Sequence, residues 1–138
     1  MYRFPNPNKN KWLDKYNELV DKVESGEIVF EQNVVSEQNG EAGRIDKLVK
    51  GKTTLHHIIP RSVFPELTND KNNHIYVPFK EHMDLHYYLW KADKSYARQL
   101  WFGCVFGRKH GLWDLPNGET EYEQLKKDLK HGRKTKQS

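Results

Sequence analysis

The residues of this chain that could do chemistry are concentrated in one short segment. Five of its seven histidines lie within 31 residues, as the pair His56 and His57, then His74, then His82 and His86. Histidine is the commonest metal ligand in proteins, and its neutral imidazole accepts protons near neutral pH. We therefore expect this segment to hold a metal ion, a general base, or both.

The spacing of these histidines allows several of them to share one ion. His82 and His86 are four residues apart, so on a helix both rings project from one face. Two such rings can grip a metal ion, and a third ligand must then come from His56 or His57. Neighbouring residues of a strand point to opposite faces. One histidine of the pair is therefore expected to bind the metal, while the other points away and serves as a base.

Strands and a helix are expected around these histidines. The stretch Thr53–Ile59 is β-branched and apolar, which is typical of a strand. Residues 60–73 contain two prolines and three asparagines and are expected to form a loop. A return strand is expected at His74–Val77. The helix that follows, Phe79–Ala92, would begin after Pro78, whose missing N–H costs nothing at a helix start.

The flanking regions add further helices and make α+β the expected fold class. After an irregular arm, the apolar spacing predicts a helix from Trp12 to Ser25. Glycines at 103, 107 and 111 argue against one continuous helix in the region that follows Ala92. The remaining expected elements are a strand at 27–35, a turn at 36–44, a strand or helix at Ile45–Val49, a helix at Tyr96–Phe106 and a charged helix at 119–131.

Composition indicates one domain with a small core and a basic surface. Of the 138 residues, 36% are hydrophobic and 30% are charged, and the net charge of +4 corresponds to a pI near 9.1. Residues 126–138 carry six Lys and Arg against one Asp. Such a basic tail is typical of contact with a polyanion or of a solvated terminus, and both interpretations stay open.

Several classes of protein are excluded by what the chain contains. The single cysteine, Cys104, excludes an intramolecular disulfide and the zinc sites that need two or more thiolates. No apolar run approaches the roughly 18 residues of a membrane span. The first ten residues lack the apolar stretch of a signal peptide. We therefore expect a cytoplasmic protein that is not secreted and does not contact a membrane.

The histidine segment resembles a known family motif. The sequences LHHIIPRS (55–62) and EHMDLH (81–86), with Asn73 between them, resemble the HNH endonuclease motif of the ββα-metal, or His-Me finger, fold. The surrounding residues are similar to small phage HNH proteins, which include free-standing homing endonucleases, and the spacing also resembles the colicin-type nucleases. The resemblance covers 31 residues of the chain, from His56 to His86.

The resemblance implies a role for each motif residue. His57 would be the general base and Asn73 would hold the loop against the helix and help to orient His57, so these two are the expected catalytic residues. His56, His82 and His86 would bind one divalent metal ion, which could be Mg, Mn, Ni or Zn. The reaction would be hydrolysis of a DNA phosphodiester bond, as a nick or a double-strand cut, leaving 5′-phosphate and 3′-hydroxyl ends.

The chain departs from the family pattern at three places. Where family members often have glycine in the loop, this chain has Ser62-Val63-Phe64-Pro65. His74 stands where a leucine commonly follows the asparagine, and Pro78 stands where a threonine is common. None of these changes removes a catalytic group. We expect His74 to be a surface residue of the second strand.

Other residues are candidates for contact with DNA. Arg61 could clamp a phosphate, because guanidinium presents paired donors to phosphate oxygens. Large aromatic side chains after the motif are expected to lie in the core and not to stack on bases; these are Tyr88, Trp90, Trp101 and Phe102. The candidate nucleic-acid contacts are Arg61, Lys126, Lys127, Lys130, Arg133 and Lys134.

The resemblance also suggests how the chain is organised. Residues 1–138 would form one nuclease domain, with an N-terminal helix and strand extension (1–50), the ββα-metal motif (53–92) and a C-terminal helical extension with the basic tail (93–138). It would act in the cytoplasm of a bacterial or phage-infected cell, with DNA as its partner. A monomer would nick one strand, and a cut of both strands would need a homodimer or two passes.

Two other functions use a similar arrangement of histidines. A zinc metalloprotease needs glutamate directly after the first histidine of the helix pair, and Met83 stands there instead. A non-catalytic, metal-stabilised DNA-binding module is the more serious alternative. A structural metal site does not need a second histidine at position 57, so the presence of His57 favours the enzyme. Homing, packaging and restriction all remain possible biological roles.

Overall fold

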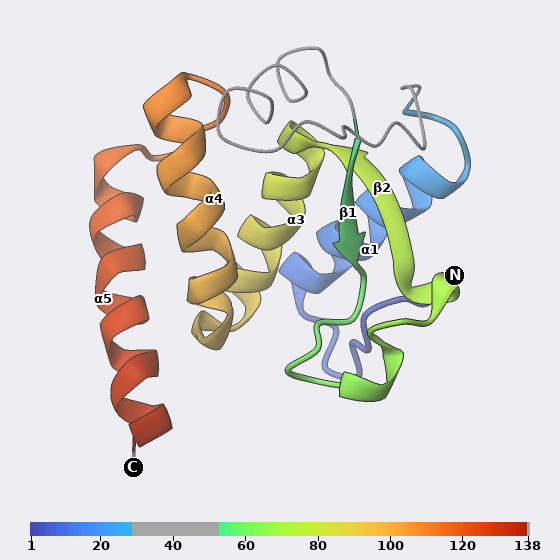
Figure 1. The fold of residues 1–138 in the computed structure, drawn as a ribbon, viewed down its shortest axis with the longest axis horizontal. Helices are drawn as coiled ribbons and strands as arrows, with labels where there is room; N and C mark the ends of the chain where they lie inside the picture. Colours follow the sequence, from blue (N-terminus) through green and yellow to red (C-terminus); the bar gives the residue numbers. More distant parts are fainter. Residues whose placement is uncertain (29–52, 138) are drawn as a thin grey trace.

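The computed structural model describes residues 1–28 and 53–137, with side chains at 1–28 and 54–130. In these residues the fold is α+β, as expected, with four α-helices and a small two-stranded sheet (Figure 1). In chain order these elements are α1 (Lys11–Glu24), β1 (Thr53–His57), β2 (His74–Pro78), α3 (Phe79–Ala92), α4 (Ala97–His110) and α5 (Glu119–Gln137). Short 3-10 turns occupy Pro65–Leu67 (η1), Lys71–Asn73 (η2) and Lys94–Tyr96 (η3).

The two strands form an antiparallel hairpin that presents the histidines on both of its faces. The register pairs His56 with Ile75 and His57 with His74. The strand expected at Thr53–Ile59 is confirmed, but it ends at His57, two residues earlier than expected. Because successive strand residues alternate in direction, His56 faces α3 and His57 faces away from it.

A buried asparagine closes the long connection between the strands. The Asn73 side chain is fully buried, and its Oδ1 accepts a hydrogen bond from the Ile59 amide at 2.8 Å. Its Nδ2 donates to the carbonyl oxygens of Ile59 at 3.0 Å and Leu67 at 3.3 Å. The Asn73 carbonyl in turn accepts from the Ile58 amide at 2.9 Å. One residue therefore ties the end of β1 to both the start of β2 and the middle of the loop.

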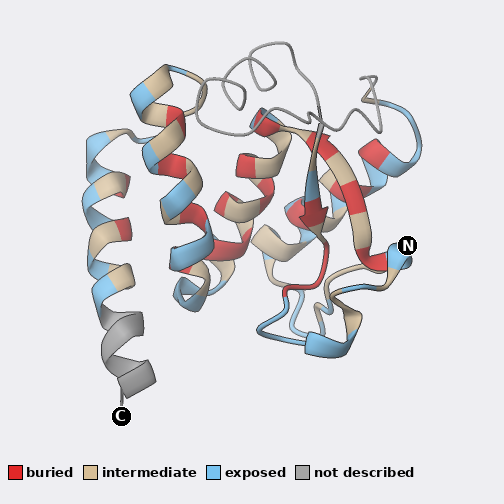
Figure 2. Cartoon of the chain, in the orientation of Figure 1, coloured by how far each residue is buried: buried red, intermediate tan, exposed pale blue. Residues whose placement is uncertain are grey.

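Helix α3 lies at the centre of the molecule and is buried on two sides (Figure 2). One side packs against α1 and the inner face of the sheet. Burial of these apolar surfaces is the main favourable term that fixes α3 beneath the strands. The buried residues of this first cluster are Tyr16, Val20, Val23, Ile58, Ile59, Ile75, Val77, Leu85 and Leu89.

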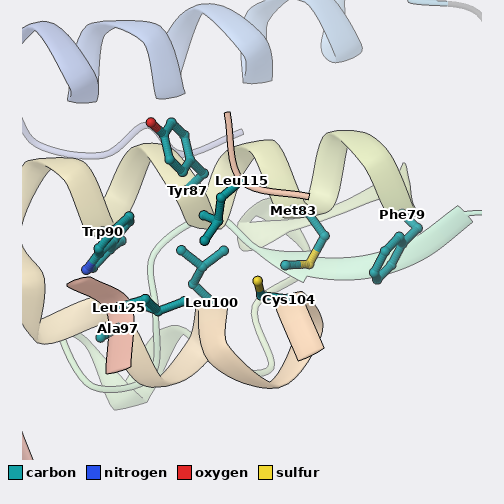
Figure 3. Packing of buried hydrophobic residues seen from close by; sticks show 9 residues of the cluster. All are labelled: Phe79, Met83, Tyr87, Trp90, Ala97, Leu100, Cys104, Leu115 and Leu125. Atoms are coloured by element: carbon teal, nitrogen blue, oxygen red, sulfur yellow. The ribbon is translucent and has the colours of Figure 1, made fainter. Parts of the chain in front are cut away.

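The opposite side of α3 packs against α4 and α5 (Figure 3). The buried residues of this second cluster are Phe79, Met83, Tyr87, Trp90, Ala97, Leu100, Cys104, Leu115 and Leu125. Polar groups also join these helices, since the Tyr87 hydroxyl donates to the buried Glu121 carboxylate and the Trp90 ring N–H donates to Asp128. Trp90 therefore belongs to the core, as expected from the sequence.

Two expectations for the C-terminal half are wrong. The helix expected at Tyr96–Phe106 is confirmed as α4, and it ends at Gly111, but Gly103 and Gly107 do not interrupt it, because these two glycines allow close packing. A β-carbon at Gly103 would overlap the Met83 side chain, and one at Gly107 would lie 3.1 Å from the Trp113 carbonyl oxygen. In addition, Phe102 is exposed and not in the core, because it borders the hollow between α3 and α4 and is not packed in their interface.

Some expectations fall on residues outside the described ranges. Most of the strand at 27–35, the turn at 36–44 and the element at Ile45–Val49 are among them. The expected helices at 12–25 and 79–92 are confirmed, and the helix expected at 119–131 continues to Gln137. Among the described residues, no helix combines the length and apolar character that crossing a bilayer requires.

We predict that Asn73→Ala lowers the free energy of unfolding by about 2–4 kcal/mol, because it leaves the buried Ile59 amide and carbonyl groups without their partner. Chemical denaturation would measure the loss. The matched control is Asn72→Ala, since Asn72 is the exposed neighbour of Asn73 and should cost less than about 0.5 kcal/mol. Equal stability of the two variants would contradict this role for Asn73.

Candidate metal centre

Three histidines from two elements converge between the sheet and α3. His56 lies on β1 and is 2% exposed, while His82 and His86 lie one turn apart on α3. The three ring centroids are each 4.9 Å from the other two. A nitrogen atom of each ring lies within 4.8 Å of a nitrogen of the others. A tetrahedral ion with bonds of about 2.1 Å would draw such nitrogens to about 3.4 Å from one another.

A buried tyrosine sets the tautomer of His56. The Tyr16 hydroxyl lies 2.5 Å from the Ile58 carbonyl oxygen, which can only accept, so the hydroxyl donates its one proton there. Burial raises the pKa of Tyr16, which keeps that proton in place. The same hydroxyl lies 2.7 Å from Nε2 of His56 and must accept from it. The lone pair of the neutral His56 ring is therefore on Nδ1.

A threonine acts on His82 in the same way. The Thr54 hydroxyl lies 3.0 Å from the Val77 carbonyl oxygen and donates to it. It lies 2.8 Å from Nδ1 of His82, so it accepts the proton of that nitrogen. The lone pair of the neutral His82 ring is then on Nε2. Hydrogen bonds of this kind orient metal-binding histidines and make them better ligands.

His86 supplies the third nitrogen. Its Nδ1 is buried, and no group of residues 1–28 or 53–130 forms a hydrogen bond with it. A buried ring nitrogen without a partner costs free energy, and a metal ion would satisfy it. Three neutral imidazoles with fixed or unsatisfied nitrogens form a donor set that suits a divalent ion, so these residues fit the metal implied by the motif.

The electrostatics of the cluster favour neutral rings. Burial lowers the pKa of His56 well below the usual value for histidine, and the neighbouring His86 and His82 lower it further. Burial and the nearby His82 lower the pKa of His86 to about 3. Since a metal binds only the unprotonated ring, both residues are held in the form that a metal needs.

A second pair of histidines lies on the other face of the strands. The rings of His57 and His74 meet edge to face with centroids 4.9 Å apart. Nε2 of His74 donates to the Thr68 carbonyl oxygen at 2.7 Å. His74 lies on the outer face of β2, as expected, and is half-buried there against His57.

The candidate DNA-binding residues do not form one group. Arg61 is exposed in the loop that follows β1. Lys127 and Lys130 are exposed on α5, and Lys126 is engaged with Glu123 at 3.4 Å. Helix α5, which also carries residues 133 and 134, packs on α4 on the side away from the strands (Figure 1). The basic helix is therefore on the far side of α4 from the strands, although its first part also contacts α3.

Two residues that shape the site were missed by the sequence analysis. Thr54 lies two residues before His56 and so shares its strand face, a signal that was available in the sequence. Tyr16 is 40 residues away from His56 on α1, and only the packing of α1 under the strand brings them together. No family model, curated protein or solved structure matches this chain.

We predict that Tyr16→Phe weakens metal binding about 10- to 100-fold, because His56 loses the hydrogen bond that fixes its tautomer and orientation. Competition with a chromophoric chelator would measure the dissociation constant for Zn²⁺. Tyr76→Phe is the matched control, since Tyr76 lies on the outer face of β2 and should leave that constant unchanged. Unaltered affinity in a folded Tyr16→Phe protein would contradict this role.

We also predict that the metal-free protein loses stability as pH falls below about 6.5, the value for histidine in an unfolded chain. Since folding lowers the pKa of His56 and His86, the unfolded chain binds protons that the folded protein does not. Each of the two histidines then lowers the free energy of unfolding by up to about 1.4 kcal/mol per pH unit. The loss for His86 continues until its folded pKa of about 3 is reached.

Urea denaturation in EDTA between about pH 7.5 and 5 would test this dependence. His86→Gln, which cannot titrate in this range, should show a shallower fall than the wild type. A wild-type stability that does not change across the range would show that the buried histidines are not held neutral.

Proposed function

We propose that this chain is a metal-dependent endonuclease of the HNH, or ββα-metal, type that hydrolyses phosphodiester bonds of DNA. The observation that carries this proposal is the convergence of His56, His82 and His86, with His57 on the opposite face of the same strand. The order of strand, loop, strand and helix across residues 53–92 is that of a ββα-metal core and supports the same assignment.

The three buried histidines are the proposed ligands of one divalent ion. Three imidazoles form a nitrogen-rich site, which suits zinc, nickel or manganese better than magnesium. An ion held there would supply charge stabilisation at the scissile phosphate and at the leaving 3′-oxygen. A three-residue ligand set also leaves a coordination position for water or substrate, as catalytic sites require.

His57 is the proposed general base. It takes a proton from a water molecule, and the water oxygen attacks the phosphorus atom while the bond from phosphorus to the 3′-oxygen breaks. The 3′-oxygen leaves with the electron pair of that bond and takes a proton from solvent water to become a hydroxyl, and the phosphate stays on the 5′ end. His74, held by its bond to the Thr68 carbonyl, packs against His57 and limits rotation of that ring. Asn73 acts through the backbone, because it holds the loop that directly follows His57.

The proposed DNA contacts form two groups, one near the scissile phosphate and one further along the duplex. Arg61 follows the strand end by four residues and is exposed, so it is suited to a phosphate near the one that is cleaved. Lys127 and Lys130 on α5, with the basic residues beyond them, would neutralise phosphates further along the duplex. The resemblance to small phage and homing nucleases favours a phage-type or homing-type role.

A second candidate function is a non-catalytic, metal-stabilised DNA-binding module. The deep burial of His56 favours this function, because an ion at this position would link β1 to α3 whether or not it took part in a reaction. The two functions differ in their use of His57. The nuclease needs it as the general base, and a structural metal site does not need it.

We predict that the protein nicks or linearises supercoiled plasmid in the presence of Mn²⁺ or Ni²⁺ and that EDTA prevents it. His57→Ala should lower the cleavage rate about 10²- to 10⁴-fold and keep metal affinity, because only the base is lost. His86→Ala should lose both cleavage and metal affinity. Agarose gels would follow the cleavage, and chelator competition would follow the metal.

His110→Ala is the control for removal of a histidine, since His110 lies at the end of α4 next to Phe106 and outside the cluster. It should cleave at the wild-type rate. Metal-dependent cleavage that survives at full rate in His57→Ala would rule out the proposed base. Metal binding without any cleavage by the wild type would instead favour the DNA-binding module.

A further inference from the structure

A cavity of about 230 Å³ adjoins the histidine cluster between α3 and α4. His82 and His86 line it from α3, and Gln99, Phe102 and Gly103 line it from α4. Two of the three proposed metal ligands therefore form part of its wall. A phosphate bound at the cluster would have the neighbouring part of its nucleotide within reach of this cavity.

Phe102 is the unusual residue of the cavity wall. Its side chain is 63% exposed, whereas Leu100 and Cys104 of the same helix are completely buried and Val105 is 40% exposed. The guanidinium carbon of Arg98 lies 6.0 Å from the centroid of the Phe102 ring. A single exposed aromatic residue is ordinary on a protein surface. Phe102, however, lines a cavity beside the candidate metal centre and has the Arg98 guanidinium at its side. It is therefore suited to a ligand with a flat ring and a nearby negative charge.

The chemistry of the cavity combines an apolar interior with a few polar groups. Met83 forms part of the wall and is buried, and a β-carbon at Gly103 would overlap its sulfur atom. The missing side chain at Gly103 therefore lets α4 approach α3 closely at this point. Gln99 provides an amide that can both donate and accept hydrogen bonds. An apolar wall with one such amide matches a nucleobase, which has flat apolar faces and a polar edge.

We propose that this cavity binds the nucleoside next to the scissile phosphate, with its base stacked on Phe102. This inference rests on the proposed nuclease function, and it adds the substrate class, namely a DNA strand that is unpaired at that position. A base within a duplex has both faces covered by its neighbours, so it can stack on a side chain only after leaving the stack. A volume of about 230 Å³ is suited to one nucleoside and not to a base pair.

The inference has two consequences that can be measured. The protein should prefer single-stranded, gapped or mismatched DNA to a fully paired duplex at the cleaved position. Removing the Phe102 ring should weaken binding of an unpaired strand roughly 5- to 150-fold, which is the range for loss of one stack between a base and an aromatic residue. It should have little effect on a fully paired duplex.

The test uses an oligonucleotide that carries 2-aminopurine, whose fluorescence falls when it stacks. Wild-type protein, Phe102→Ala and Phe102→Trp are titrated into the single strand and into its duplex in EDTA, so that no cleavage occurs. Val105→Ala is the matched control, because Val105 is 40% exposed on the same helix and does not line the cavity. In parallel, the same proteins are assayed for cleavage of both substrates with metal.

We expect the wild type and Val105→Ala to quench the single strand, Phe102→Ala to lose the quenching and Phe102→Trp to restore it. Equal binding and quenching by Phe102→Ala and the wild type would overturn the inference, as would the absence of quenching by the wild type. If the wild type cuts DNA and Phe102→Ala cuts both the single strand and the duplex as fast as the wild type does, the cavity inference fails and the nuclease proposal stands. If the wild type quenches through Phe102 but never cuts, the nuclease proposal fails and the nucleoside site stands.

Discussion

The site depends on one constraint, which is the burial of three imidazoles at one place. The rings of His56, His82 and His86 lie 4.9 Å apart between a strand and a helix, where charge is unfavourable. Neutral rings that are buried still need partners for their nitrogens. Tyr16 and Thr54 each satisfy one nitrogen, and each does so by donating its own proton to a backbone carbonyl. The remaining lone pairs are then available together to a cation, so the polar groups that stabilise the fold also orient the histidines of the candidate metal site.

Helix α3 couples this site to the whole hydrophobic core. Leu85 and Leu89 pack toward the sheet, and Met83 packs toward α4, so two apolar surfaces enclose the helix. At about 100° per residue, His82 and His86 fall on the stripe between these surfaces. The ligands cannot move without disturbing one of the two clusters. The same stripe is the edge where the cavity beside α4 begins, which explains why a hollow and a ligand pair occur together.

The parts of the site that follow from local geometry could be predicted from the sequence. The period of a strand puts His56 and His57 on opposite faces, and the period of a helix puts His82 and His86 on one face, so these placements need no knowledge of the fold. The choice of His56 as the ligand came from the motif. The parts that depend on packing between distant elements could not be predicted. Tyr16 reaches His56 from 40 residues away, and Gly103 reads as a helix breaker until its contact with α3 is known. Phe102 was expected to lie in the core because the periodicity of a helix shows which of its faces is apolar. Periodicity does not show whether another element covers that face.

The two faces of β1 give different evidence about the function of the site. A structural ion explains why His56 is buried and why its tautomer is fixed, since both strengthen a link between strand and helix. It does not explain why the next residue and its cross-strand partner are also histidines. The rings of His57 and His74 pack together at the strand end, and the Thr68 carbonyl holds His74 in place. Asn73 further restrains the loop that leaves this point. A structural metal site does not need a second imidazole positioned in this way, whereas a general base does. The outer face therefore supports the proposed nuclease.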